Sequence, residues 1–196
     1  MQDPRTKAPA PWTGAVMIAL AGCFLAGCGA PAVSYIHPDV DFGYMERAAV
    51  VPFLNLSQDA LAGDRVQSIF LMELLEEDVL TLVDPRETDA AMRNLGLSPG
   101  TELSPQQAVR LGSELGVQAL FFGVVEEYDA GQSNRTRGPE ITGLFGMIET
   151  QTGAVVWRSQ VHETGGSIWK RLFGGSPDDV YTVSRDAVRR ALRTLL

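Results

Sequence analysis

The residues of this sequence with the most distinctive chemistry are two thiols in a repeated motif. Leu-Ala-Gly-Cys occurs twice within residues 20–28, so that Cys23 and Cys28 each follow the same three residues. They are the only two cysteines of the 196-residue chain. Because both lie so near the N-terminus, they cannot form a disulfide framework for a domain further along. Either they are small apolar residues of a hydrophobic stretch, or one thiol is modified.

The segment around the two cysteines is typical of a secretory signal. Arg5 and Lys7 precede an apolar run at residues 14–25, and residues 8–38 contain no Asp, Glu, Lys or Arg. The run is shorter than the roughly 20 apolar residues that a spanning helix needs, and a stretch interrupted by glycine and proline follows it. A basic start, a short apolar core and small residues indicate a signal peptide rather than a stable span.

The end of this signal resembles the bacterial lipobox, in which Leu, a small residue and Gly or Ala precede a cysteine that receives diacylglycerol. The resemblance implies that this cysteine becomes residue one after cleavage and carries several acyl chains, which together give a lasting anchor. Cleavage before Cys28 gives a fuller signal core, so we predict lipidation there, with Cys23 as the alternative. Gly29, by resemblance to enterobacterial sorting, favours the outer membrane. The expected organisation is a signal peptide at residues 1–27, a flexible tether at 28–45 and one globular domain at 46–196.

Few residues of the expected domain could support catalysis or hold a metal. A hydrolase needs a nucleophile beside a base. The chain has two histidines, His37 in the expected tether and His162 on an expected strand, and neither stands in a recognisable motif. Glu126, Glu127 and Asp129 could suggest paired-carboxylate catalysis or a Ca²⁺ site, but such a cluster at a strand end is more typical of a solvated rim. Structural zinc normally takes four Cys or His ligands. We therefore predict no enzyme activity, no metal and no cofactor, and the formal charge of −8 disfavours nucleic acid as a partner.

Hydrophobic periodicity and helix caps predict an α/β (α+β) domain. Strands are expected at residues 47–53, 79–83, 117–128, 140–149 and 154–163. Helices are expected at 60–77, 85–95, 105–115 and 177–195, the last three beginning at the caps Asp84, Ser104 and Ser176, each followed by proline. Gly116 fits the left-handed end of the helix at 105–115. The order β-α-β-α-α-β-β-β-α indicates a mixed sheet with helices packed on it.

The last two expected strands form a hairpin with Gly153 in its turn. Residues 154–163 alternate, which places two sets of side chains on opposite faces of the sheet. Trp157, Ser159 and Val161 share one face, and Arg158, Gln160 and His162 share the other. We expect the second face to be wet, with His162 as a solvated surface residue.

Residues 165–176 combine large apolar side chains with paired glycines at both ends. Ile168, Trp169, Leu172 and Phe173 surround Lys170 and Arg171, a spacing that could form one amphipathic helical turn. Large apolar side chains are costly to expose, so we expect them to be covered. They either pack onto the domain's own sheet beneath the last helix, anchor a partner, or enter a lipid interface with Lys170 and Arg171 at the headgroups. Ile168, Trp169 and Phe173 are the candidate contacts in the last two cases.

Several blocks of the sequence, taken in order, resemble the CsgG/LpoB/TolB-N-terminal group of bacterial envelope proteins. The matching blocks are AAVVPFLNLS, LTLVDP, AVRLGSELGVQALFFGVV and MIETQTGAVVW, within residues 47–162. The family's usual Asp in the hairpin turn is replaced here by Glu149 or Gln151, depending on the alignment. Members share a fold but differ in function, since some activate cell-wall synthases, some form secretion pores, and others are uncharacterised lipoproteins.

The resemblance implies a lipid-anchored, periplasm-facing envelope protein without catalysis, which binds a partner in cell-wall synthesis or an export assembly. The alternative is an oligomeric ring subunit of a secretion channel. Pore-forming members carry two long amphipathic hairpins, whereas the link at residues 129–139 is short and polar. The sequence therefore favours the accessory over the pore.

Overall fold

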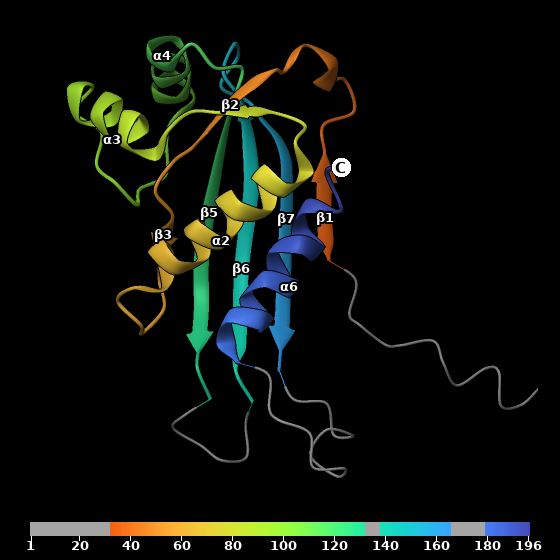
Figure 1. Cartoon of the computed structure of the whole chain (residues 1–196). Helices are drawn as coiled ribbons and strands as arrows, with labels where there is room; N and C mark the ends of the chain where they lie inside the picture. The colour runs from red at the N-terminus through yellow and green to blue at the C-terminus, as the bar shows by residue number, and fades with distance from the viewer. Residues whose placement is uncertain (1–31, 132–137, 166–178) are drawn as a thin grey trace, which may run out of the picture. The chain divides into compact units, whose positions relative to one another are not determined.

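A seven-stranded mixed sheet with helices on both faces forms the domain, as the computed structural model shows for residues 32–131, 138–165 and 179–196 (Figure 1). The predicted fold class and order of elements are confirmed, with two further short strands and a 3₁₀ turn. In chain order the elements are β1 (Val33–Ile36), η2 (Phe42–Tyr44), β2 (Arg47–Val50), β3 (Leu54–Asn55), α2 (Ala62–Glu77), β4 (Thr81–Leu82), α3 (Pro85–Asn94), α4 (Pro105–Leu115), β5 (Ala119–Asp129), β6 (Glu140–Glu149), β7 (Val155–Thr164) and α6 (Val180–Leu192).

The sheet has a long antiparallel centre and a short parallel edge. The strand order is β1-β7-β6-β5-β2-β4, and β3 pairs with the far part of β5. β5, β6 and β7 are antiparallel neighbours of ten or eleven residues each, whereas β2 and β3 run parallel to β5. β6 and β7 form the expected hairpin, and Gly153 in its turn has a φ of 75°, a conformation that glycine adopts without strain.

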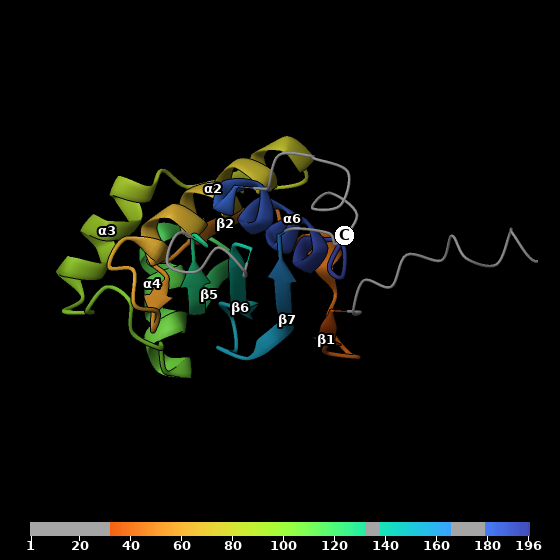
Figure 2. The same ribbon diagram turned by 90° about the horizontal axis from the view of Figure 1, so that it is seen from below.

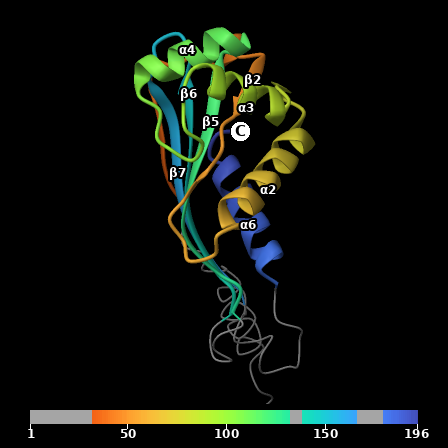
Figure 3. The ribbon, with the colours of Figure 1, turned by 90° about the vertical axis from the view of Figure 1, so that its left-hand side faces the viewer.

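One face of the sheet is covered by α2 and α6, which lie side by side (Figure 3). The core beneath them is aromatic: the ring of Phe70 lies 5.4 to 5.7 Å from those of Phe53, Phe121 and Phe145. Trp157 is fully buried beside Phe121 and donates from Nε1 to the Thr194 hydroxyl at 3.0 Å. This packing fixes the long strands against two helices that are distant in sequence.

Ion pairs add to the contact between α2 and α6. Glu73 of α2 is only 5 % exposed and pairs with Arg189 and, at 3.6 Å, with Arg185. Arg189 also donates to Glu76 at 2.9 Å. The arginines near the end of α6 therefore do more than oppose the helix dipole, because they pair with acids on a neighbouring element.

The opposite face carries a second, smaller core to which α3 and α4 both contribute buried residues. Of these helices, α4 lies on the side of the sheet away from α2 and α6 (Figure 2). Alternate residues of the strands divide between the two cores: Ala48 and Phe121 belong to the first, and Ala49 and Leu120 to the second. Gly112 lets α4 approach the β6–β7 turn closely, because a Cβ there would lie 2.3 Å from Thr150. The second core thus lies at one end of the sheet.

The predicted caps of α3 and α4 are confirmed. The Asp84 carboxylate accepts from the Arg86 N–H at 2.8 Å, and Ser104 forms a reciprocal capping box with Gln107. Gly116 ends α4 in the left-handed conformation with a φ of 62°. α6 differs, because its cap is Asp179, which accepts from the Thr182 N–H at 2.7 Å; the expected cap Ser176 lies outside the described residues.

The expected tether at residues 28–45 differs from the structure over most of its length. β1 pairs antiparallel with β7, Tyr35 opposite Arg158, and η2 follows it. The Tyr44 hydroxyl donates to Glu149, which ties this segment to the β6–β7 hairpin. β-branched and aromatic residues at 33–36 suit an edge strand, so the described domain begins near Ala32 rather than at residue 46. In the described ranges no helix is long and apolar enough to cross a membrane.

Candidate functional site

Part of the second sheet face is not covered by helices and carries exposed side chains. On β7, Trp157, Ser159 and Val161 are buried, while Arg158, Gln160 and His162 are exposed, which confirms the predicted alternation. α3 and α4 cover only one end of this face (Figure 3). We call the remainder the open face; its side chains include Phe122, Leu144, Arg158, Gln160 and His162, with Val33 and Tyr35 of β1 in register beside them.

A shallow groove crosses the open face where it meets the loop between α3 and α4. Its volume is about 90 Å³, and its walls include Pro52, Leu54, Leu103, Phe122 and Arg158. The Arg158 guanidinium lies 5.8 Å from the centre of the Phe122 ring, within range of a cation–π contact. Small-molecule sites usually enclose about 300–1,000 Å³, so this groove is too small to hold a typical substrate.

A larger hollow lies between α2 and the start of α6. Its volume is about 480 Å³, and Ile69, Met72, Tyr128, Val180 and Tyr181 line it. Met72 and Tyr181 are more than half exposed. Val180 and Tyr181 are the first two residues of α6, so the hollow opens where the chain enters this helix.

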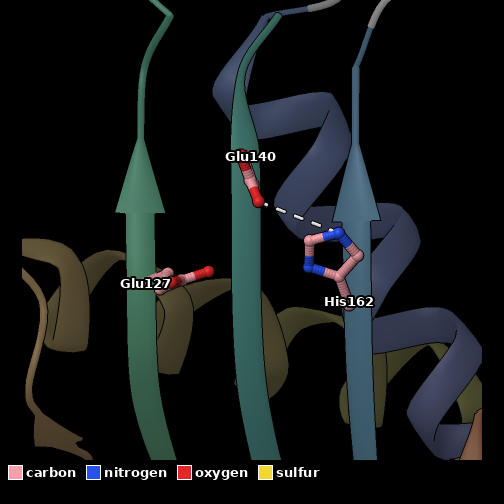
Figure 4. Close-up of side chains that lie close together, drawn as sticks. All are labelled: Glu127, Glu140 and His162. Carbon is pink, nitrogen blue, oxygen red and sulfur yellow. Dashed lines mark ion pairs between the residues drawn. The ribbon is translucent and has the colours of Figure 1, made fainter. Parts of the chain in front are cut away.

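Three side chains that can act as metal ligands or as acid–base groups meet on the open face (Figure 4). Glu127 of β5, Thr142 of β6 and His162 of β7 are neighbours in the strand register, and Glu140 lies two residues from Thr142 along β6. One ligand atom each from Glu127, Glu140 and His162 lies within 4.8 Å of the others. We call these three residues the Glu–His cluster.

Hydrogen bonds to Thr142 hold part of this cluster in place. The Thr142 hydroxyl donates to Glu127 Oε2 at 2.9 Å and lies 3.0 Å from His162 Nδ1. His162 Nε2 lies 3.8 Å from Glu140 Oε1. The expected surface position of His162 is confirmed, since its side chain is 54 % exposed, but it is not an isolated residue.

The arrangement of Thr, His and Glu does not amount to an activated nucleophile. A nucleophilic hydroxyl must give its proton to the neighbouring base, whereas the Thr142 proton is directed to Glu127. The Nε2–Oε1 separation of 3.8 Å is also too long for a hydrogen bond that would orient the imidazole. The cluster is thus better suited to binding a cation than to acyl transfer.

A second polar contact organises the β6–β7 turn. The Glu149 carboxylate accepts from the hydroxyls of Thr152 and Tyr44, and these bonds lower the pKa of Glu149. Burial, followed by the bond to Glu149, raises the pKa of Tyr44 to about 12. The tyrosine therefore stays a neutral donor at physiological pH, and the contact is structural.

Sequence and fold comparisons give different results. No protein-family model matches the chain, and no curated protein matches it. Among solved structures, a PelC L103M dodecamer from Paraburkholderia phytofirmans matches at 18% identity and a TM-score of 0.59, over 84% of this chain and 97% of that one. The NMR structure of E. coli LpoB matches at 16% identity and a TM-score of 0.50, over 83% and 75%. Lipoprotein GNA1162 from Neisseria meningitidis matches at 16% identity and a TM-score of 0.50, over 65% and 91%.

The chain has the LpoB/PelC-like fold. The sequence resemblance is therefore confirmed at the level of fold. At identities of 16–18% the likeness establishes the architecture alone.

The predicted site residues of this LpoB/PelC-like chain lie outside the described residues. These are the lipidation candidates Cys28 and Cys23 and the contact candidates Ile168, Trp169 and Phe173. The structure instead brings together residues that the sequence left apart. The sequence analysis did not predict a role for Glu140, because only the strand register places it beside His162 and Glu127.

Proposed function

We propose that this chain is a bacterial lipoprotein, acylated at Cys28 and held at the outer membrane with its domain facing the periplasm. In this role it acts without catalysis, as a partner-binding accessory of cell-wall synthesis or of an export assembly. The observation that carries the proposal is the fold, which the chain shares with PelC, LpoB and lipoprotein GNA1162. The Leu-Ala-Gly-Cys motif behind a short apolar run supplies the means of anchoring.

Metabolic labelling tests the anchor. Cells expressing the chain are fed a clickable palmitate analogue, and the purified protein is assayed for label and membrane fraction. We expect wild type and Cys23→Ala to carry label in the outer membrane, and Cys28→Ala to carry none. Label retained by Cys28→Ala and lost from Cys23→Ala would move the site to Cys23, and label absent from all three would refute acylation.

Ile168, Trp169 and Phe173 are the proposed partner contacts. In-cell cross-linking of a C-terminally tagged chain, followed by identification of the captured proteins, tests this role. We expect a cell-wall synthase or an export component to be captured by wild type and lost from Trp169→Ala/Phe173→Ala. Leu56→Ala is a suitable control, since Leu56 is 58 % exposed on a loop of the domain.

The folding of the double variant separates the alternatives for these side chains. If Trp169→Ala/Phe173→Ala unfolds at markedly lower urea than wild type, the rings pack on the domain itself and the contact proposal is wrong. If it folds normally and keeps its protein partner but binds anionic lipid vesicles less well, the rings serve a lipid interface. Normal folding with loss of the partner supports the proposal.

A ring subunit is the second candidate, because the PelC structure with a TM-score of 0.59 is a dodecamer. Light scattering on detergent-solubilised protein distinguishes the two roles. A particle of several protomers, with a regular ladder of self-cross-links in cells, would favour the ring. A monomer that cross-links to a different protein would favour the accessory.

A further inference from the structure

The Glu–His cluster presents three metal-ligand side chains from three adjacent strands. Hydrogen-bonded strands hold Glu127, Thr142 and His162 in one row across the sheet, and Glu140 lies on the same face two residues along β6. Their ligand atoms lie within 4.8 Å of one another, and the side chains converge in front of β6 (Figure 4). Because the row is part of the sheet, small side-chain rotations suffice to bring the atoms onto one centre.

Thr142 determines which imidazole nitrogen is available as a ligand. A hydroxyl has one proton, and Thr142 gives it to the Glu127 carboxylate, which can only accept. The 3.0 Å contact with His162 must therefore run from Nδ1–H to the threonine oxygen. In the neutral imidazole this leaves the Nε2 lone pair free. A polar group that orients a histidine through its other nitrogen is the usual companion of a metal-bound histidine.

The free Nε2 lone pair faces another acceptor. Glu140 Oε1 lies 3.8 Å away, so two acceptor atoms point toward one another unless a proton or a cation lies between them. Zn²⁺ binds nitrogen and oxygen at about 2.0–2.2 Å, which places two ligands of a tetrahedral ion about 3.3 Å apart. A closure of about 0.5 Å would convert the observed pair into a ligand pair of such an ion.

We propose that Glu127, Glu140 and His162 form a binding site for a divalent transition metal, with Zn²⁺ as the ion that this donor set fits best. An imidazole nitrogen beside carboxylate oxygens suits zinc, whereas magnesium and calcium prefer oxygen ligands alone. Three protein ligands leave a position for water or for a group of another molecule. The sequence analysis predicted no metal site because it interpreted Glu127 as part of a solvated rim and His162 as a solvated surface residue; the strand register brings the two together with Glu140.

The local charge also favours a cation. Within residues 32–131, 138–165 and 179–196, the only ion pair that involves Glu127 or Glu140 is the one with His162. Glu126 and Asp129 add negative charge on β5 nearby. A bound Zn²⁺ would offset this charge and join the ends of β5, β6 and β7, so we expect it to stabilise the domain by binding the folded state.

Isothermal titration of ZnCl₂ into the full chain in detergent tests the site. The protein is purified through a tag that contains no histidine. We expect one Zn²⁺ per wild-type chain, and a rise in its melting temperature on addition of zinc. His162→Gln, Glu127→Gln and Glu140→Gln should each weaken binding at least tenfold, and Thr142→Val should weaken it about 10–100-fold by removing the group that orients the ligands.

His37→Gln is the matched control, because His37 is the other histidine of the chain and lies outside the Glu–His cluster. It should bind zinc as tightly as wild type. The site is refuted if wild type takes up no zinc at 100-fold molar excess, in which case the cluster is an ion pair only. It is also refuted if His162→Gln binds as wild type does. His162 and Glu127 are exposed, so their variants should fold, and circular dichroism checks this.

Discussion

Gly112→Ala tests directly how α4 packs on the sheet. A Cβ at Gly112 would lie 2.3 Å from both Cβ and Cγ2 of Thr150, far inside the roughly 3.5–4.0 Å of a favourable carbon–carbon contact. Thr150 is held on two sides: its hydroxyl donates to the Val117 carbonyl at 2.6 Å, and its N–H donates to the Gln118 carbonyl at 3.0 Å. The threonine cannot move aside without loss of these buried bonds.

Two opposing effects determine the free energy of this substitution. Alanine in place of glycine inside a helix normally stabilises a protein by about 1 kcal/mol. Overpacking a close contact costs about 1–3 kcal/mol, and occasionally more. Since the clash exceeds 1 Å, we expect the cost to reach the upper end of this range, about 3 kcal/mol. The net loss in the free energy of unfolding is then about 2 kcal/mol, or a melting temperature about 4–8 °C lower.

Urea unfolding followed by circular dichroism measures the effect. Ser113→Ala is the control, because Ser113 is the exposed neighbour in α4 and should gain a few tenths of a kcal/mol at most. Combined with Thr150→Gly, the Gly112→Ala change should lose most of its cost, which a double-mutant cycle would record as coupling. If Gly112→Ala alone raised stability by about 1 kcal/mol, α4 would not pack against the β6–β7 turn and the reasoning would be refuted.

Three further predictions concern the core and its polar contacts. Phe70→Ala removes a fully buried ring that contacts three other aromatic rings, and should lower the free energy of unfolding in urea by about 3–5 kcal/mol; a loss below 1 kcal/mol would contradict the aromatic core. Thr194→Val leaves the buried Trp157 Nε1–H without its acceptor and should cost about 1–2 kcal/mol, whereas in a Trp157→Phe background the same change should cost much less. Burial raises the pKa of Glu163, against the opposing effect of Arg190. The folded state therefore binds the Glu163 proton more tightly than the unfolded state does. The stability that this proton contributes falls as pH rises through the raised pKa. Glu163→Gln should therefore gain stability relative to wild type as pH rises above the usual pKa of a glutamate; a relative loss would mean that the pairing with Arg190 outweighs burial.

The parts of the fold that the sequence predicted are those set by local chemistry. Asp84 and Ser104 begin helices because their side chains satisfy backbone N–H groups a few residues away. Apolar and polar residues alternate along β7 because one face of this strand is buried and the other is exposed to water, so the sequence predicts which side chains share a face. Such signals depend only on neighbours in the chain.

β1 was not predicted because its sequence contains neither a cap nor a regular alternation of apolar and polar residues. All four of its residues are exposed, so no alternation of apolar and polar side chains distinguishes it from a tether. Its partner strand lies more than a hundred residues away, and Val33 pairs with Gln160. The β-branched and aromatic composition of this segment permits a strand, and the free edge of β7 supplies the partner that makes it one.

The Glu–His cluster could not be predicted from the sequence, for a related reason. Regular alternation along β5 after Val124 would place Glu126, rather than Glu127, on the open face. A bulge between Val125 and Glu127 shifts the register, so that Glu127 pairs with Thr142. A bulge depends on the fit of two strands, and one strand's sequence does not reveal it.

The early start of the domain also changes how the proposed lipoprotein would work. With acylation at Cys28 and the described domain beginning at Ala32, the chain between them can extend no more than about 14 Å. The expected tether to residue 45 would have allowed about 60 Å. If Cys28 is the acylated residue, this covalent limit keeps the start of the domain close to the membrane surface, and a partner would bind it there.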